Sequence, residues 1–284
     1  MPDFGIFRGF NEKLFGDKLY AGQLPTQLGL IGSEEVSDID PDYKAILDYA
    51  TTQGYTLPSG AQQALQNALV VDLKGAGVWS KLDTFAVFAT DGDSDFALID
   101  WINLSQYTSY NSPTFTSNQG FQGNGTSSYI DTNYNANTNG VNYSLNSASI
   151  GGYMRIGDTS PGSSEALLFA TDGTNFSWMR YTSKRAYFNS STFTGYTTTL
   201  GQSNQFASFI RTSSTNLQIF VNGSITDNLT NNSAGVPNST FYTLRGITTN
   251  FSDSQMSMVY AGGDLSSEQS DFYTAFYTNY LSNL

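Results

Sequence analysis

The sequence contains neither cysteine nor histidine among its 284 residues. Without cysteine there can be no disulfide bridge and no thiolate zinc site, and without both residues Ser-His-Asp and Cys-His catalysis are excluded. A pH switch based on imidazole is excluded for the same reason. Much of the side-chain chemistry that enzymes use is therefore missing, and we expect a non-enzymatic protein without a cofactor.

Basic residues are scarce, with 12 Lys and Arg against 24 Asp and Glu, so the formal net charge is −12. Residues 1–100 carry 15 acidic and 6 basic side chains, whereas residues 101–264 carry 7 and 6. An acidic front of this kind is typical of a solubilising surface. With no basic patch among the aromatic residues and no bilayer-length apolar run, we expect neither nucleic-acid binding nor a membrane span.

The first 39 residues consist of short apolar clusters broken by glycine, such as FGIFRGF and LPTQLGLIG. They indicate an extended arm that needs another surface to bury its apolar side chains. The region has no pattern of a secretory signal. We expect residues 1–39 to anchor the protein to a partner, with docking aromatics at Phe4, Phe7, Phe10 and Phe15.

Residues 40–77 predict a helical hairpin. Asp40 can cap a first helix that starts at Pro41 and ends before Gly54, and Ser59 with Gln62 forms a capping box for a second helix. The expected apolar stripe of the second helix is Ala61, Leu65, Ala68, Leu69 and Leu73. The hairpin either packs on the following domain or is a separate docking module.

Residues 78–264 change to a period of two, which predicts an antiparallel sandwich of short strands. Asn222-Gly223 suits a two-residue hairpin turn. Further strands are expected at 84–89, 96–102, 127–132, 149–156, 165–171, 175–181, 205–212, 216–221, 240–245 and 255–261. Residues 265–284 then predict a helix with a capping box at Ser266 and Gln269 and an aromatic face of Phe272, Phe276, Tyr280 and Leu284.

Residues 90–96 read TDGDSDF and place aspartates at 91, 93 and 95, as an EF-hand calcium loop begins. Such a loop needs glycine at its sixth position and glutamate at its twelfth, but Phe96 and Ile102 stand there. The Asp-Gly pair instead suits a hairpin turn between the strands at 84–89 and 96–102. We therefore expect a turn, with calcium binding by Asp91, Asp93 and Asp95 as the alternative.

A series of phrases in this order resembles bacteriophage virion proteins with a concanavalin-like (laminin-G-like) jelly-roll domain. They include ILDYATTQGYTLPSGAQQALQNALVVDLKGAGVWSKLDTFAVFAT, FALIDWINL, LQIFVNG and AGGDLSSEQSDFYTAFYTNYL, and the resemblance covers about residues 45–284. It implies a mainly β jelly-roll sandwich in a tail fibre, spike, head fibre or capsid decoration, with a surface that faces the host or its glycans. It matches no motif in the arm.

An enzyme on a similar sandwich, such as a polysaccharide depolymerase, is the alternative function. Retaining glycosidases need two carboxyl groups about 5 to 5.5 Å apart and inverting ones about 6.5 to 9.5 Å. Glu165 has no second acid nearby in the sequence, and the separate Asp131, Asp158 and Asp172 occupy positions where turn residues are expected. Only an encounter of these aspartates in the fold would support the enzyme.

Sugar binding would use aromatic rings together with amides and carboxylates. The region 106–129 offers Tyr107, Tyr110, Phe115, Phe121 and Asn124, although rings so common in this chain also suit the edge of a sandwich. We expect a non-enzymatic virion protein, assembled in the host cytoplasm, that contacts other virion proteins through its arm. A homo-oligomer that attaches to host-surface glycan fits this expectation.

Overall fold

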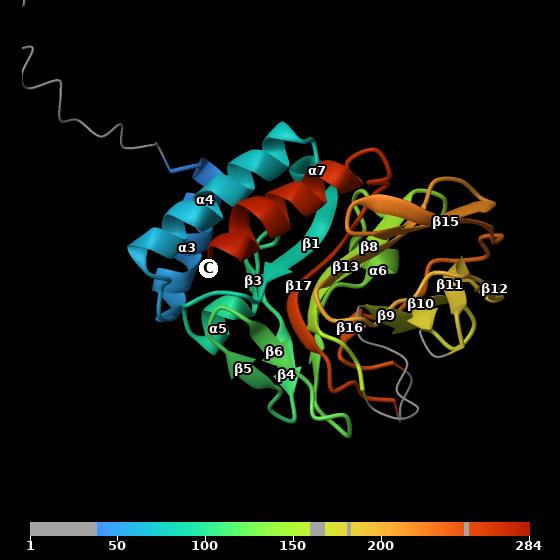
Figure 1. Ribbon diagram of the computed structural model, residues 1–284, viewed down its shortest axis with the longest axis horizontal. Helices are drawn as coiled ribbons and strands as arrows, with labels where there is room; N and C mark the ends of the chain where they lie inside the picture. Colours follow the sequence, from blue (N-terminus) through green and yellow to red (C-terminus); the bar gives the residue numbers. More distant parts are fainter. Residues whose placement is uncertain (1–38, 160–167, 181–182, 247–249) are drawn as a thin grey trace, which may run out of the picture. The chain divides into compact units, whose positions relative to one another are not determined.

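The computed structural model describes residues 39–159, 168–180, 183–246 and 250–284, and residues 40–284 form one compact unit (Figure 1). The predicted arm, including Phe4, Phe7, Phe10 and Phe15, lies outside the described residues apart from Ile39. Glu165 lies outside them as well. Among the described residues, no helix combines the length and apolarity that crossing a membrane requires.

Two antiparallel sheets form the sandwich, which confirms the predicted fold class. The first sheet has eight strands in the order β15-β14-β13-β8-β17-β6-β5, and β1 also pairs with β17. These strands are β1 (Leu82–Val87), β5 (Thr114–Thr116), β6 (Gly120–Gln122), β8 (Ala148–Ile156), β13 (Gln205–Arg211), β14 (Asn216–Val221), β15 (Ser224–Thr230) and β17 (Gln255–Gly262).

The second sheet has seven strands in the order β12-β11-β10-β9-β16-β7-β4. They are β4 (Thr108–Tyr110), β7 (Tyr129–Asp131), β9 (Phe169–Thr171), β10 (Phe176–Arg180), β11 (Arg185–Ser190), β12 (Thr194–Gly195) and β16 (Tyr242–Thr243). Two short strands, β2 (Ile99–Asp100) and β3 (Ser105–Gln106), form a separate small hairpin, and a short helix, α6 (Ala136–Asn139), follows β7.

Two hydrophobic cores divide the molecule into three layers. One core lies between the sheets, where Ile150 and Phe209 of the first sheet meet Phe188 and Ile130 of the second. The other lies between the first sheet and the helices. Alternate strand residues contribute to the two cores, so the first sheet is buried on both faces. The helical segments within residues 41–75 and 269–283 cover its face away from the second sheet (Figure 1).

The helical pair is present as predicted, as α3 (Pro41–Gln53) and α4 (Gly60–Gly75). Asp40 caps α3, Gly54 ends it with a φ of 79°, and Ser59 caps α4 by accepting the Gln62 N–H. Both helices pack on the first sheet rather than forming a separate module.

The predicted apolar stripe of α4 is partly wrong. Ala61 and Ala68 are exposed and Leu65 is half-buried, whereas Gln62 and Gln66 are buried beside Leu69 and Leu73. The buried face is therefore partly polar, and its glutamines need hydrogen-bond partners in the protein.

The carboxy-terminal helix begins later than predicted. It consists of α7 (Gln269–Tyr273), a π-helix η2 (Thr274–Tyr280) and a 3-10 turn η3 (Leu281–Asn283). The capping-box prediction is wrong, because no side chain caps α7 and Gln269 instead donates to the Tyr260 hydroxyl. The aromatic face is confirmed at Phe272, Phe276 and Tyr280, all fully buried against the sandwich, while Leu284 is exposed.

The hairpin predicted at 90–96 is wrong, whereas the one at Asn222-Gly223 is confirmed between β14 and β15, with φ angles of 49° and 77°. β1 pairs with β17, and the chain after it turns into a short helix, α5 (Ser94–Ala97), capped by Asp93. Gly92 does not have the positive φ of a hairpin turn. A Cβ atom at Gly92 would lie 2.9 Å from the Thr56 oxygen, so glycine permits the α3–α4 loop to approach.

Candidate functional site

The three aspartates of TDGDSDF bind different protein groups. Asp91 accepts the Ser59 N–H at 2.9 Å, and Asp93 accepts the Thr56 N–H at 2.6 Å and the Phe96 N–H at 2.8 Å. Asp95 accepts the Gln106 side-chain amide at 3.1 Å. The stretch therefore fastens the α3–α4 loop to the sandwich. Across the described residues, no group of three or more acidic side chains is placed to hold a metal ion.

Four of the five expected sugar-binding residues serve the fold. Tyr107 and Phe121 are buried between the sheets and Phe115 packs against that core. Asn124 accepts backbone N–H groups from residues 126–128 and so closes its own loop. Tyr110 differs, because 41% of its surface is exposed on the outer face of the second sheet.

The outer face of the second sheet is lined with aromatic rings, and we call it the outer aromatic face. Along β7, β9, β10 and β11, every second side chain enters the inter-sheet core, namely Ile130, Ala170, Ser177, Ala186 and Phe188, and Thr243 of β16 is fully buried. Their neighbours therefore point outward. These outward residues are Tyr110, Tyr129, Phe169, Phe176, Trp178, Tyr187 and Tyr242, and Phe193 and Phe251 join them from adjoining loops.

One end of this face holds the Tyr129 cluster, which comprises Tyr110, Tyr129, Tyr242, Phe251 and Arg245. Tyr110 and Tyr129 stack with centroids 4.7 Å apart, and Tyr242 meets Tyr129 edge-on at 5.7 Å. The Arg245 guanidinium carbon lies 4.5 Å from the Tyr129 centroid and 4.9 Å from that of Tyr242. Burial raises the pKa of Tyr129, and Arg245 acts against this shift, so the ring stays a neutral phenol.

The other end holds the Tyr187 cluster, which comprises Phe176, Tyr187, Phe193 and Arg185. Tyr187 lies 5.3 Å from Phe176 and 5.7 Å from Phe193, whose surface is 47% exposed. The Arg185 guanidinium carbon lies 4.2 Å from the Phe193 centroid. This second end therefore repeats the combination of accessible rings and a guanidinium group.

Trp178 and Phe169 join the two clusters. Trp178 stacks on Tyr187 at 5.6 Å and meets Phe169 at 5.5 Å, and Phe169 pairs with Tyr242 across the sheet. Both rings are nearly buried, yet neither belongs to the two hydrophobic cores. The aromatic surface thus runs across the sheet, with its accessible rings at the two ends.

Two of the aspartates that an enzyme could use, Asp131 and Asp172, accept hydrogen bonds from the protein itself. Asp131 accepts from the Asn133 N–H and the Thr240 hydroxyl. Asp172 accepts from the backbone N–H groups of residues 174, 175 and 238, and these bonds lower its pKa. Asp158 is half-buried beyond the end of β8. These bonds are those of turn-closing side chains.

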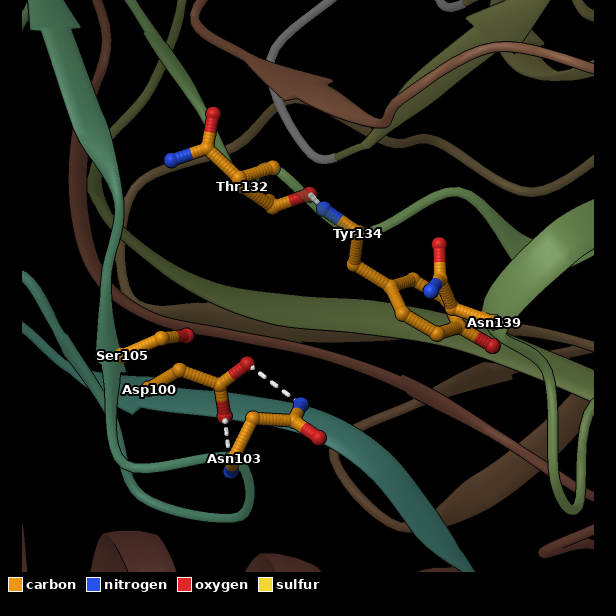
Figure 2. A pocket seen from close by; sticks show the side chains of 7 residues that line it. Asp100, Asn103, Ser105, Thr132, Tyr134 and Asn139 are labelled. Atoms are coloured by element: carbon orange, nitrogen blue, oxygen red, sulfur yellow. Dashed lines mark hydrogen bonds between the residues drawn. The ribbon is translucent and has the colours of Figure 1, made fainter.

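A polar cavity of about 210 Å³ lies beyond the end of β7, lined by Asp100, Asn103, Ser105, Thr132, Asn133, Tyr134 and Asn139 (Figure 2). Asp100 accepts hydrogen bonds from the Thr84 hydroxyl at 2.7 Å, the Asn103 amide at 2.8 Å and three backbone N–H groups. Burial raises the pKa of Asp100, although these bonds oppose the shift. Both carboxylate oxygens of Asp100 accept hydrogen bonds from groups of the protein itself. The side chain therefore holds the loop after β2 in place and is not directed at a ligand.

The outer aromatic face is therefore the candidate site. Apart from Tyr110, the sequence reasoning did not identify its residues. The signal was present in RAYFNS, where the adjacent rings Tyr187 and Phe188 point to opposite sides of the strand, and in FSWMR, where Phe176 and Trp178 share one side. A strand of this kind has a second apolar face that needs an explanation.

No protein-family model and no curated protein matches this sequence. Among solved structures, the chain is similar to domain 4 of AbnA, a GH43 extracellular arabinanase from Geobacillus stearothermophilus in complex with arabinotriose, with 14% identity and a TM-score of 0.47. That similarity covers 68% of this chain and 98% of the other.

A Trypanosoma rangeli sialidase mutant with trans-sialidase activity has 15% identity and a TM-score of 0.48, over 75% of this chain and 39% of the sialidase. The binding domain of botulinum neurotoxin serotype D has 9% identity and a TM-score of 0.44, over 70% and 52%. Similarities this low carry no argument about function, so the fold class rests on the strand pairings themselves.

Proposed function

We propose that this protein is a non-enzymatic glycan-binding protein exposed on a virus particle, and that its outer aromatic face contacts host-surface carbohydrate. The observation that carries the proposal is the row of rings on that face, accessible at Tyr110 and Phe193 and half-buried at Tyr129, Tyr187 and Tyr242. The place on a virus particle is supported by the sequence resemblance alone.

Aromatic rings at a sheet surface suit carbohydrate for a physical reason. A pyranose ring has an apolar face of C–H groups, which packs on an aromatic face, while its hydroxyl groups need polar partners at the rim. The Tyr129 cluster contains both kinds of group, because its tyrosine rings lie beside the Arg245 guanidinium. Two clusters on one sheet would let neighbouring sugar units of a polymer bind together, which increases the affinity beyond that of either cluster.

The experiment measures affinity of the purified protein for a panel of soluble polysaccharides by affinity electrophoresis. We expect Tyr129→Ala and Tyr242→Ala to weaken binding of any retained polymer about tenfold or more, because each removes a stacking ring. The matched control is Tyr49→Ala, a half-buried tyrosine on α3 at the other side of the first sheet, which should leave affinity unchanged.

Two results would contradict the proposal. Equal binding by the wild type and both ring variants would mean that the outer aromatic face is not the site. Release of new reducing ends during incubation would instead establish the alternative function, a polysaccharide depolymerase.

A further inference from the structure

We infer that the ligand of the outer aromatic face is an anionic polysaccharide, in which carboxylate-bearing sugars pair with Arg245 and Arg185. This inference rests on the proposed glycan-binding function and specifies its substrate class. Its basis is the placement of cations in a chain whose net charge is −12.

The ion pairs within the described residues all lie in the helical layer or beside it. They join Lys44 to Asp48, Lys74 to Asp40 and Asp42, and Lys81 to Glu268. Neither Arg245 nor Arg185 forms an ion pair with a described carboxylate. Carboxylates in or beside the helical layer thus neutralise Lys44, Lys74 and Lys81. The guanidinium groups of Arg245 and Arg185 on the outer aromatic face have no such partner among the described residues.

The Arg245 side chain is positioned by aromatic rings rather than by hydrogen-bond acceptors. Its guanidinium lies within 6 Å of three ring centroids, at 4.5 Å from Tyr129, 4.9 Å from Tyr242 and 5.9 Å from Phe251. Its Nε is buried and has no hydrogen-bond partner in the described part of the chain. Stacking fixes the plane of the group while its charge stays uncompensated by an ion pair, which prepares it for a bidentate carboxylate.

Asp131 is a carboxyl group whose pKa is affected by the charge of Arg245. Arg245 acts to lower the pKa of Asp131, yet burial raises that pKa overall and the two groups form no ion pair. Asp131 instead accepts from the Asn133 N–H and the Thr240 hydroxyl. Its carboxylate therefore does not occupy the place that a sugar carboxylate would take.

Arg211 provides a comparison, because it is an arginine with a purely structural role. Arg211 is fully buried and donates to the carbonyl oxygens of Phe188 and Asn231 and to the Asn231 side chain. All of these acceptors belong to the fold. Arg245 and Arg185 lack such acceptors and lie among partly exposed rings, so a structural role of the Arg211 kind does not account for them.

The test compares polygalacturonate with its carboxyl-reduced neutral form, so that the two polymers share a backbone and differ in charge. We expect at least tenfold tighter binding of the acidic polymer, and loss of most of this difference in Arg245→Gln with little change for the neutral polymer. Arg185→Gln should act in the same direction at the second cluster. Lys44→Gln on α3 is the matched control, and thermal melting verifies that each variant is folded.

The outcomes separate the two proposals. Equal affinity for the acidic and neutral polymers would overturn the anionic class and leave glycan binding intact. Retention of neither polymer, together with no binding across the wider panel, would remove the proposed function itself. Equal retention of polyglutamate, which carries carboxylates but no sugar rings, would show attraction to charge alone and would also overturn the inference.

Discussion

The outer faces of the two sheets differ in what covers them rather than in how apolar they are. The first sheet places Phe85, Tyr153, Phe206 and Tyr260 on its outer face, and the helical layer buries them completely or nearly so. The second sheet presents a comparable row of rings, of which Tyr110 is exposed and Tyr129 is half-buried. The aromatic face of the first sheet is therefore buried throughout, whereas that of the second is buried at Phe169 and Trp178 and accessible at its two ends.

The helices explain this difference. The fully buried aromatic side chains of the last helical segment, Phe272, Phe276 and Tyr280, all pack on the first sheet, together with Tyr43 of α3. On the second sheet, guanidinium groups lie over rings at the two ends of the outer aromatic face, Arg185 over Phe193 and Arg245 over Tyr129. Cations over rings are compatible with water and with a polar ligand, whereas a dry helix interface is not.

The largest expected effect is a difference in unfolding free energy between ring deletions on the outer faces of the two sheets. Phe272→Ala should lower the free energy of unfolding by about 3 to 5 kcal/mol, because the ring is fully buried. Its centroid lies 4.8 Å from that of Tyr260, 5.3 Å from that of Phe206 and 6.1 Å from that of Phe85. Tyr110→Ala, on the outer aromatic face, should cost less than about 1 kcal/mol. Urea unfolding measures both, and equal losses would mean that the second sheet's outer face is also covered.

The next effect concerns the polar contacts beneath the helical layer. Gln66 accepts from the Tyr43 hydroxyl at 2.8 Å and donates to Thr90 and to the Tyr280 hydroxyl at 3.2 Å. Gln66→Ala should lower the free energy of unfolding by about 1 to 3 kcal/mol, because buried partners lose their hydrogen bonds. Its control is Gln63→Ala, which removes one bond to the Pro58 oxygen and should cost less. A larger loss in the control would contradict this account.

The sequence predicted the elements that depend on local pattern. The strands near 149–156, 205–212, 216–221 and 255–261 match β8, β13, β14 and β17 closely, because each segment is short, rich in aromatic and aliphatic residues, and bounded by turn residues. The caps at Asp40 and Ser59 were equally local.

Errors arose where distant residues decide the local structure. Gln66 is buried because the Tyr280 hydroxyl, 214 residues further on, reaches it, and no window of α4 contains that information. Asp93 caps α5 and holds the α3–α4 loop, which overrides the turn that an Asp-Gly pair would favour. The clusters of the candidate site depend in the same way on strand order, since Tyr129 and Tyr242 meet only through the pairing of β7 with β16.

The smallest effect uses pH, because the outer aromatic face also carries a carboxyl group at Asp131, on the same side of β7 as Tyr129. Burial raises the pKa of Asp131 above 3.8, despite the bonds from Asn133 and Thr240 and the charge of Arg245. A folded-state pKa above the unfolded value means that the native state keeps its proton longer. This carboxyl's contribution to stability is therefore present below about pH 4 and is lost as the pH rises through its folded pKa.

Asp131→Asn should remove this slope, so that the variant gains stability relative to the wild type as the pH rises from 4 to 7 in urea unfolding. Asp172→Asn is the control, because backbone N–H bonds from Asn175 and Thr174 lower that pKa and confine its effect to pH values below about 4. A difference between wild type and Asp131→Asn that stays constant over this range would mean that Asp131 is as well solvated as an ordinary surface carboxyl.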